Sequence, residues 1–391
     1  GYSVFAVDFF GDMDLYPNVK DCLIVIKELG ATYHNIKENY GHFLAEFTID
    51  LLKTHPKIDY LIIGSGLDDN FKEREKILKE IELSNYSISN LNNNLESIRL
   101  ARNILGLYEI LKSNGYKVPI TYSFNQIEKN ILQLPFPFIL KKTKSAGGIN
   151  VNKIENENDL TFFINLNELN SANSSNWLIQ EYLEGIPVSC TTISNGKECE
   201  IITINRQIVG EKFVNSPKEF MYCGNLVPAA DLFKEDKRII VEISKLLVAK
   251  LKLKGINGFD FVLKNHYPYL MEINPRIPGS ISVSETVLNL NLLDLHVQSF
   301  NETGWQNVKK IIRSAKPEGY ATKLIFFAPR DLNENQIEQI NKICYVHDKT
   351  ESSKKVYKNE PVCTVLYRAN TFADSYFGAL KIIDEIKKII E

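Results

Sequence analysis

The chain has 391 residues, of which 44% are hydrophobic and 24% charged, and its formal net charge is −2. A chain of this length usually forms two or three domains, and the small net charge gives it no general attraction to nucleic acid or to an anionic membrane. No apolar run approaches the roughly 20 residues that a membrane-spanning helix needs. The six cysteines show no C-x-x-C spacing, which favours reduced thiols in a cytoplasmic protein over a zinc site or a disulfide framework.

The first part of the chain alternates strands and helices. An apolar strand ends at Asp8, a helix is expected over residues 41–53, and a buried strand is expected over residues 58–64. This alternation predicts a parallel, Rossmann-like α/β domain. Because the chain opens almost at once on a strand, we expect that its N-terminus is truncated.

Glycines and acids follow the second of these strands, in the segment GSGLDD at residues 64–69. Open α/β sheets bind ligands at the carboxyl ends of their strands, but G-x-G-x-x-G is absent here. A plain strand-to-loop turn is therefore favoured over a substrate contact. An Asn-rich loop at residues 90–94 and one helix over residues 95–114 then lead to a domain boundary at Pro119.

A basic, glycine-rich segment begins the next part, PFPFILKKTKSAGGINVNKI at residues 135–154. Lys141 and Lys142 end an apolar strand, and Gly147 and Gly148 lie in the loop before another strand. Glycines let backbone N–H groups turn toward an anion, which the lysines would neutralise. No helix follows and G-x-x-x-x-G-K-[ST] is absent, so this is not a P-loop. The segment predicts a β-hairpin flap over a nucleotide triphosphate, with an ordinary basic hairpin as the alternative.

The segment WLIQEYLEG at residues 177–185 is an apolar strand with a polar exit. The exit consists of Gln180, Glu181, Tyr182 and Leu183. Such an edge can pair its backbone with the rim of an adenine while Leu183 packs on the base. Taken alone, the segment is explained more simply as a core strand followed by a turn.

The clearest pattern is GINGFDFVLKNHYPYLMEINPRIPGS at residues 255–280, two alternating strands joined by a polar turn. Side chains of one parity share a face of a hairpin, so Asp260, Glu272 and Asn274 are expected to converge. Their oxygens suit Mg²⁺ or Mn²⁺ held jointly with phosphate, not Zn²⁺. Arg276 can place a bidentate cation against a phosphoryl or carboxylate group. A surface hairpin with ordinary turn residues is the alternative.

Other polar residues receive structural interpretations. His296 lies at helical spacing among apolar residues and is expected in the core, not as a catalytic base. Arg206 either reaches an acceptor pocket or lies on a solvated sheet face. Residues 319–391 predict a small β-rich unit with a terminal helix, in which Cys363 is a core residue and not a nucleophile.

The order and spacing of the three segments resemble the ATP-grasp superfamily over roughly residues 95–300. In that family ATP lies between two α+β lobes, so the resemblance implies an ATP-grasp fold, preceded by the α/β domain and followed by the β-rich unit. The expected domains are an N-terminal pre-ATP-grasp domain, a flap and adenine-edge lobe, a catalytic Mg-binding lobe and the C-terminal unit. Their expected bounds are residues 1–118, 119–187, 188–318 and 319–391.

The resemblance also implies which residues act. The family's lysine after the flap strand falls on Lys141, its glycine loop on Gly147 and Gly148, and its adenine-edge segment on Gln180, Glu181, Tyr182 and Leu183. Its two metal-ligating acids and its amide fall on Asp260, Glu272 and Asn274, and its catalytic arginine falls on Arg276.

Two positions depart from the family pattern. An earlier family lysine has no clear match, and Arg102 and Asn103 occupy its vicinity. The acid that often holds the ribose is replaced around Pro187, which leaves Glu184 as a poor substitute. These departures put the ribose contact and the nucleotide affinity in doubt.

With its opening segment VDFFGD and its C-terminal strands, the chain looks like the predicted ATP-dependent carboligases distantly related to biotin carboxylase, found largely in archaea and methylotrophs. That resemblance implies an ATP- and Mg²⁺-dependent ligase that activates a small-molecule carboxylate as an acyl phosphate for attack by an amine. Two alternatives stay open: a bicarbonate-activating carboxylase and a non-catalytic ATP-binding regulatory protein. Neither nucleic acid nor a membrane is an expected partner, and a homo-oligomer is left open.

Overall fold

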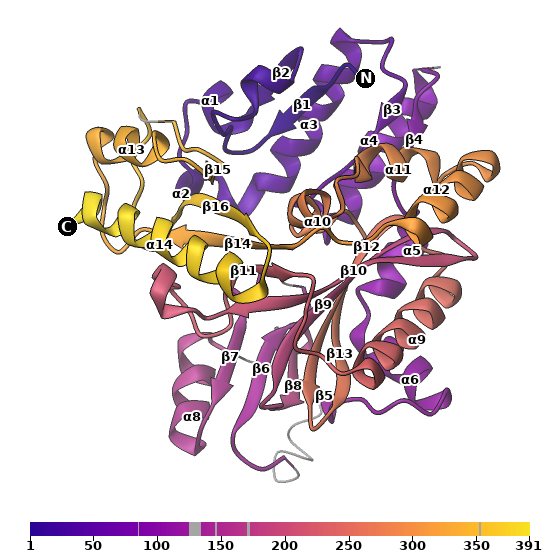
Figure 1. Ribbon diagram of the computed structural model, residues 1–391, viewed down its shortest axis with the longest axis vertical. Coiled ribbons are helices and arrows are strands. Elements are labelled where there is room, and N and C mark those ends of the chain that lie inside the picture. Colours follow the sequence, from indigo (N-terminus) through magenta and orange to yellow (C-terminus); the bar gives the residue numbers. More distant parts are fainter. Residues whose placement is uncertain (85, 125–133, 145–146, 170–172, 352) are drawn as a thin grey trace.

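The computed structural model describes residues 1–391 apart from 85, 125–133, 145–146, 170–172 and 352 (Figure 1). In the view of Figure 1, the N-terminal part lies at the top, an eight-stranded sheet crosses the middle, and a four-stranded sheet lies at the bottom. The mixed α/β architecture is the predicted one. None of the described helices has the length and apolar character of a membrane span.

The N-terminal part contains two short pairs of parallel strands. β1 (Phe5–Asp8) pairs with β2 (Asp21–Ile24), and β3 (Tyr60–Leu61) pairs with β4 (Ser89–Asn90). The helices around them are α1 (Val25–Glu28), α2 (Tyr33–Ile36), α3 (Tyr40–Thr54) and α4 (Phe71–Leu83). The parallel pairing is the one that the strand–helix alternation predicts.

β3 is much shorter than the strand expected over residues 58–64. Its pairing stops because the backbone N–H of Ile63 donates to the Asn92 side chain, 2.7 Å away, and not to a strand partner. Asn92 also donates to the carbonyl of Leu61 at 3.0 Å. The Asn-rich loop therefore ends the ladder and fixes the segment that follows β3.

The helix predicted over residues 95–114 is broken in two. α5 (Leu95–Ala101) ends before Arg102, and α6 (Ile104–Ser113) starts after Asn103. The Asn103 side chain accepts a hydrogen bond from Gly106 N at 3.2 Å, as an N-cap does. This cap competes with helix continuation and places Arg102 at the break.

The four-stranded sheet is antiparallel, in the order β5-β8-β6-β7. Its strands are β5 (Thr121–Ser123), β6 (Phe138–Lys142), β7 (Val151–Ile154) and β8 (Trp177–Glu181). α8 (Glu157–Leu166) packs on one face, over a core that includes Phe138, Leu140 and Trp177. β6 and β7 form the hairpin that the sequence predicts.

The eight-stranded sheet has the order β13-β12-β9-β10-β11-β14-β16-β15. Its strands are β9 (Ile186–Asn195), β10 (Cys199–Val209), β11 (Tyr222–Val227), β12 (Lys254–Lys264), β13 (Tyr267–Asn274), β14 (Tyr320–Phe327), β15 (Val346–His347) and β16 (Pro361–Ala369). The helices that follow and flank them are α9 (Lys234–Leu251), α10 (Ile281–Leu288), α11 (Leu292–Gln298), α12 (Glu302–Ser314), α13 (Glu334–Asn341) and α14 (Phe372–Ile390).

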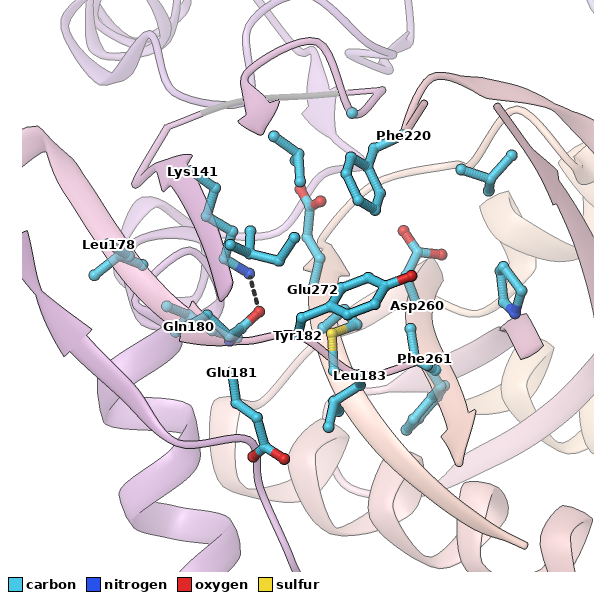
Figure 2. A pocket seen from close by; sticks show the side chains of 18 of the residues that line it. Lys141, Leu178, Gln180, Glu181, Tyr182, Leu183, Phe220, Asp260, Phe261 and Glu272 are labelled. Atoms are coloured by element: carbon cyan, nitrogen blue, oxygen red, sulfur yellow. Dashed lines mark hydrogen bonds between the residues drawn. The ribbon is translucent and has the colours of Figure 1, made fainter. Parts of the chain in front are cut away.

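β12 and β13 form the predicted hairpin, with Asp260 directly opposite Glu272 and Gly258 opposite Asn274. The turn uses Asn265 and His266, both at positive φ (51° and 58°), which suits a tight two-residue hairpin turn. Phe259 and Phe261 alternate with Asp260 and are buried in the core that contains α9. Figure 2 shows the result, with Asp260 and Glu272 facing a common cavity.

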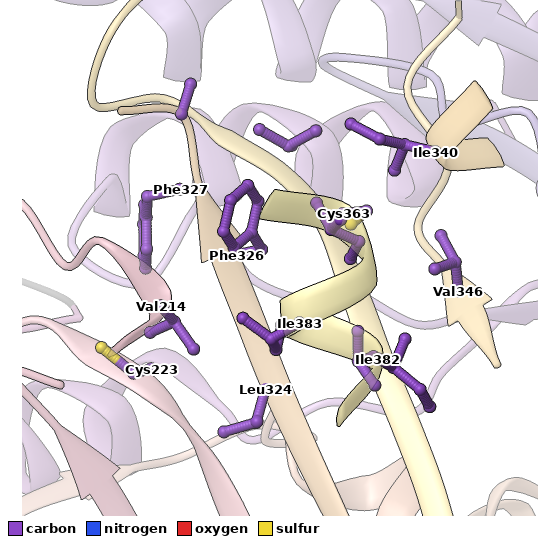
Figure 3. Close-up of a cluster of buried hydrophobic side chains, with 14 of the residues drawn as sticks. Val214, Cys223, Leu324, Phe326, Phe327, Ile340, Val346, Cys363, Ile382 and Ile383 are labelled. Carbon is purple, nitrogen blue, oxygen red and sulfur yellow. The ribbon is translucent and has the colours of Figure 1, made fainter. Parts of the chain in front are cut away.

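The strands expected in a separate C-terminal unit extend this same sheet. β14 pairs with β11 on one side and with β16 on the other. Phe326 of β14, Cys363 of β16 and Ile383 of α14 belong to one core cluster between these strands and the helix (Figure 3). Burial raises the pKa of the Cys363 thiol to about 12, which suits a core residue and not a nucleophile. The domain bounds given above stay predictions.

His296 is also a core residue, as expected. It is 3% exposed, its Nδ1 accepts a hydrogen bond from Ile256 N at 3.0 Å, and its Nε2 donates to the carbonyl of Leu91 at 2.9 Å. Burial lowers its pKa to about 4, although the bond to Leu91 acts in the opposite direction. The imidazole is therefore neutral and links α11 to β12 and to the Asn-rich loop.

This burial predicts a pH-dependent free energy of unfolding. The unfolded state takes up the proton near the usual histidine pKa of about 6.5, well above the folded-state value. Stability is therefore unaffected by this group above that pH and falls by roughly 2 kcal/mol by pH 5. In urea unfolding, the free energy of unfolding of the wild type should be lower at pH 5 than at pH 7.5. In His296→Gln this pH-dependent loss should be smaller by about this amount. The exposed-site variant His42→Gln is the control, and an unchanged pH dependence in His296→Gln would contradict the assignment.

Candidate active site

A cavity of about 390 Å³ lies where the two sheets face each other, lined by side chains from both (Figure 2). Most of the residues predicted from the sequence line it: Lys141, Gly148, Gln180, Glu181, Tyr182, Leu183, Asp260 and Glu272. Gly147, Asn274 and Arg276 are close to these residues along the chain but do not line this cavity. The fold therefore brings eight of the predicted residues around one space.

Asp260 and Glu272 form the acidic side of the cavity. The Asp260 carboxylate accepts hydrogen bonds from Gln207 Nε2 and from Asn274 Nδ2, each at 2.9 Å. Burial and, second, the negative charge of Glu272 raise the pKa of Asp260 to about 7, although both amide bonds act to lower it. The two acids are thus held together at an electrostatic cost that a bound cation would relieve.

The donor set fits a hard divalent cation. In the described part of the chain, no three His, Cys, Asp or Glu side chains form a metal-binding group. The cluster offers two carboxylates, and Asn274 lies beside them with its Nδ2 toward Asp260, so its amide oxygen would have to turn inward to join the set. Such an incomplete oxygen set matches Mg²⁺ or Mn²⁺, which usually complete their coordination with water and phosphate oxygens.

Lys141 supplies a cation from the opposite sheet. Its Nζ donates to Gln180 Oε1 at 3.0 Å, as the dashed line in Figure 2 marks. Burial lowers its pKa to about 8, Glu272 acts to raise it, and Arg102 lowers it. An additional negative charge in the cavity would therefore favour the charged ammonium.

Gln180 is buried, and its side chain makes hydrogen bonds to three other side chains of the interior. Besides accepting from Lys141, it donates Nε2 to Tyr108 Oη and to Thr121 Oγ1, both at 2.9 Å. These three bonds fix the amide and thereby aim Lys141. The backbone of Gln180 lies between β5 and β6 in the sheet, so the adenine contact expected of this residue stays a prediction.

The rest of the predicted adenine edge lies along the cavity. Glu181 N donates to the carbonyl of Ile120 at 2.8 Å, so this N–H is already engaged. The edge that remains is formed by Tyr182 and Leu183, and Lys153 lies 4.7 Å from the centre of the Tyr182 ring. Glu184 and Pro187, where the sequence departs from the family pattern, also line the cavity.

Arg102 is the site residue for which the sequence analysis assigned no role. Its NH1 donates to Glu272, and its Nε and NH2 donate to the two oxygens of Asp69 at 3.0 and 2.8 Å. Burial alone would lower its pKa, but Glu272 and Asp69 outweigh burial and raise it, so the charge is permanent. The available signal was the polar pair Arg102–Asn103 inside an otherwise helical pattern.

Arg276 points toward the N-terminal part of the chain. Its Nε donates to both carboxylate oxygens of Asp68, at 3.0 and 2.8 Å, and its NH1 donates to the carbonyl of Ile277 at 3.0 Å. The loop at residues 64–69, expected as a plain turn, thus contacts two arginines of the site. Arg276 is brought next to the acidic cluster by chain connectivity, and its side chain is oriented by Asp68 of the N-terminal part.

The glycine loop is docked across the cavity onto the other sheet. Tyr222 N donates to the carbonyl of Gly147 at 3.1 Å, and Lys218 Nζ donates to the carbonyl of Ile149 at 2.7 Å. A Cβ at Gly148 would lie 1.7 Å from the carbonyl oxygen of Phe220, whereas a Cβ at Gly147 would meet no atom within 4 Å. Glycine at position 148 therefore permits a contact that any other residue would prevent.

Comparison with known proteins identifies the region that carries this site. Residues 101–280 match the ATP-grasp domain family. An uncharacterized protein of Methanocaldococcus jannaschii is 27% identical over 383 residues, 95% of this chain and 84% of that protein. D-alanine–D-alanine ligase of Flavobacterium johnsoniae is 23% identical over 178 residues, 44% of this chain and 54% of the ligase. The chain thus spans about half the length of that ligase.

Solved structures share the fold over nearly the whole chain. L-amino acid ligase from Bacillus licheniformis has a TM-score of 0.68 at 14% identity, covering 98% of each chain. Biotin carboxylase from Campylobacter jejuni, in a β,γ-ATP complex, has a TM-score of 0.66 at 14% identity, covering 99% of this chain and 95% of the other. At such low identities the likeness concerns the fold.

The docked glycine loop predicts a difference between two neighbouring substitutions. Gly148→Ala should push the loop off Phe220, because the backbone oxygen that it meets cannot move away cheaply. Gly147→Ala meets no atom and costs only about 1 kcal/mol, from its positive φ. Limited trypsin digestion should therefore cut after the exposed Lys144 at least several-fold faster in Gly148→Ala than in Gly147→Ala. Equal cutting rates would mean that the loop is not held by this contact.

Proposed function

We propose, from the premise that this chain contains an ATP-grasp domain, that it is an ATP- and Mg²⁺-dependent ligase that activates a carboxylate. The finer proposal is that the activated acid, an acyl phosphate, is then attacked by an amine. The observation that carries it is the charge arrangement around one cavity: the opposed acids Asp260 and Glu272 on one side, and the cations Lys141 and Arg102 beside them. This arrangement suits a triphosphate with a bound metal ion better than an uncharged ligand.

The reaction balances without an oxidant or reductant. A carboxylate oxygen of the acid attacks the γ-phosphorus of ATP, the bond from that phosphorus to the β,γ-bridging oxygen breaks, and ADP leaves. The amine nitrogen then attacks the acyl carbon, inorganic phosphate leaves, and the nitrogen loses a proton. Phosphoryl transfer of this kind depends mainly on positioning and charge neutralisation, which are what these residues offer.

Asp260, Glu272 and Asn274 would hold the metal ion. When bound, Mg²⁺ would neutralise charge on the β- and γ-phosphates and help to orient them. Gln207 keeps the Asp260 carboxylate in place through its 2.9 Å bond. Since Mg²⁺ demands nearly fixed geometry, this support contributes to binding although Gln207 itself need not touch the metal.

Lys141 and Arg102 would bind the phosphate chain. Gln180 orients Lys141 through their hydrogen bond. Burial lowers the pKa of Lys141, and the negative charge of bound phosphates would raise it again and so favour the charged ammonium. Arg102 stands where the family lysine is missing, and its planar guanidinium can take two phosphate oxygens at once. Arg276 would hold the transferring phosphoryl group or the acid.

The glycine loop would cover the phosphates. Its contact with the segment around Phe220 closes one side of the cavity, so that water has less access to the acyl phosphate. The adenine would lie along Tyr182 and Leu183. Because the Glu181 N–H is engaged with Ile120, base recognition would rest on the remaining backbone groups of that edge.

The metal assignment predicts the effect of one neutral substitution. Glu272→Gln removes a negative ligand but keeps the size of the side chain, so Mg²⁺-dependent ADP formation should fall on the order of 10²-fold or more. The control is Glu157→Gln, at an exposed position of α8, which should leave the rate unchanged. Full Mg²⁺-dependent turnover in Glu272→Gln would overturn the assignment.

The reaction itself is tested by ADP and phosphate release from Mg-ATP, with pooled carboxylates and pooled amines, with and without bicarbonate. We expect ADP only when a particular acid and amine are both present. Dependence on bicarbonate would replace the ligase with a carboxylase, and AMP in place of ADP would exclude an acyl phosphate. Tight ATP binding without product under any of these conditions would favour a regulatory ATP-binding protein.

A further inference from the structure

Two consecutive acids of the N-terminal part each bind one arginine of the ATP-grasp domain. They lie in the loop that joins β3 to α4. Asp68 receives Arg276 Nε at 2.8 and 3.0 Å, and Asp69 receives Arg102 through two parallel bonds of 3.0 and 2.8 Å. Neither acid lines the cavity; of the two arginines only Arg102 does, so Asp69 is the acid that reaches the cavity through an arginine.

The loop that presents these acids is firmly held. Leu67 is 4% exposed and packs in the N-terminal core with Ala45 and Ile49. Its carbonyl accepts a 2.6 Å bond from Arg74 Nε. Asn70 closes the loop from the other side, donating to the carbonyl of Gly66 at 3.0 Å and to Tyr40 Oη at 3.2 Å. Asp68 and Asp69 therefore extend from a loop whose backbone is held on both sides.

A second set of contacts joins the N-terminal part to the β12–β13 hairpin. Asn93, which is 6% exposed, donates to the carbonyl of Pro275 at 2.9 Å and to Asn257 Oδ1 at 2.7 Å. Its own oxygen accepts from Lys254 N at 2.7 Å. The Asn-rich loop thus holds both the start of β12 and the residue before Arg276. These contacts join the N-terminal part to β12 and to the residue that follows β13, in the hairpin that carries Glu272.

Arg102 connects Asp69 of the N-terminal loop to Glu272 of the hairpin. Asp69 engages Nε and NH2, which leaves the NH1 edge turned toward Glu272 and the cavity. A metal ion on Glu272 would compete for that carboxylate. Asp69 would then be the carboxylate that keeps the guanidinium in its plane while NH1 turns to a phosphate oxygen.

We propose that Asp69 is a positioning residue for the nucleotide phosphates, acting through Arg102, so that the N-terminal domain forms part of the ATP site. This inference rests on the proposed function, because it requires that ATP binds in the cavity. It assigns to residues 64–70 a role that a surface turn does not have.

A double-mutant cycle tests the coupling. The dissociation constant of the β,γ-methylene analogue of ATP, with Mg²⁺, is measured by calorimetry for the wild type, Asp69→Asn, Arg102→Gln and the double variant. Asp69→Asn alone should weaken binding roughly tenfold. In the Arg102→Gln background the same change should have less than a twofold effect, because the group through which Asp69 acts is gone.

Two further variants separate positioning from a loss of structure. Asp59→Asn makes the same chemical change at an exposed residue just before β3 and should leave binding unchanged. Asp69→Glu restores the charge with a longer reach and should recover part of the affinity that Asp69→Asn loses. Recovery by Glu also keeps the test decisive if Asp69→Asn lowers the melting temperature.

The outcomes distinguish this inference from the proposed function. If the wild type binds the analogue but Asp69→Asn binds it equally well, the inference is wrong and the proposed function stands. If the effects of the two substitutions simply add, Asp69 does not act through Arg102 and the inference is again wrong. If the wild type does not bind the analogue at all, the proposed function fails and the inference falls with it.

Discussion

The site depends on two carboxylates that the hairpin forces to face each other. Side chains directly opposite in an antiparallel pair lie about 5 Å apart at Cβ, so the pairing of Asp260 with Glu272 places two negative charges in a partly buried position. Their repulsion, added to burial, raises the pKa of Asp260 to about 7. The surrounding groups stabilise this negative charge: Gln207 and Asn274 donate hydrogen bonds to Asp260, and Arg102 donates to Glu272.

The cations come from parts of the chain that are far apart in sequence. Lys141 lies on β6 of the four-stranded sheet, and Arg102 lies at the break between α5 and α6, next to the N-terminal part. Each is held by a residue that does not itself carry chemistry, Gln180 for Lys141 and Asp69 for Arg102. This division suits phosphoryl chemistry, in which preorganised charge contributes more than covalent participation. It also means that the proposed nucleotide site draws on both large sheets and on the N-terminal part of the chain.

Much of the site could be predicted because its strongest signals are local. Alternation along β12 and β13 fixes which side chains share a face, and the residue types Asp, Glu and Asn restrict the metal. The glycine hairpin is similarly local, since glycines in a loop beside lysines indicate a close approach of the backbone. The structure adds the reason for one of them: Gly148 has no room for a Cβ against Phe220.

By itself, the sequence determined the mixed α/β architecture, the hairpin that carries Asp260, Glu272 and Asn274, the hairpin with the glycine loop, and the core positions of His296 and Cys363. All of these follow from periodicity and residue type over short stretches. Tertiary structure alone decided what Arg102, Asp68 and Asp69 contact. It also decided that Gln180 faces inward and that the C-terminal strands continue the main sheet. These features depend on pairings between residues up to about 200 positions apart, such as Asp68 with Arg276. A local pattern carries no information on such pairings, since the same acid in the same turn could equally face solvent.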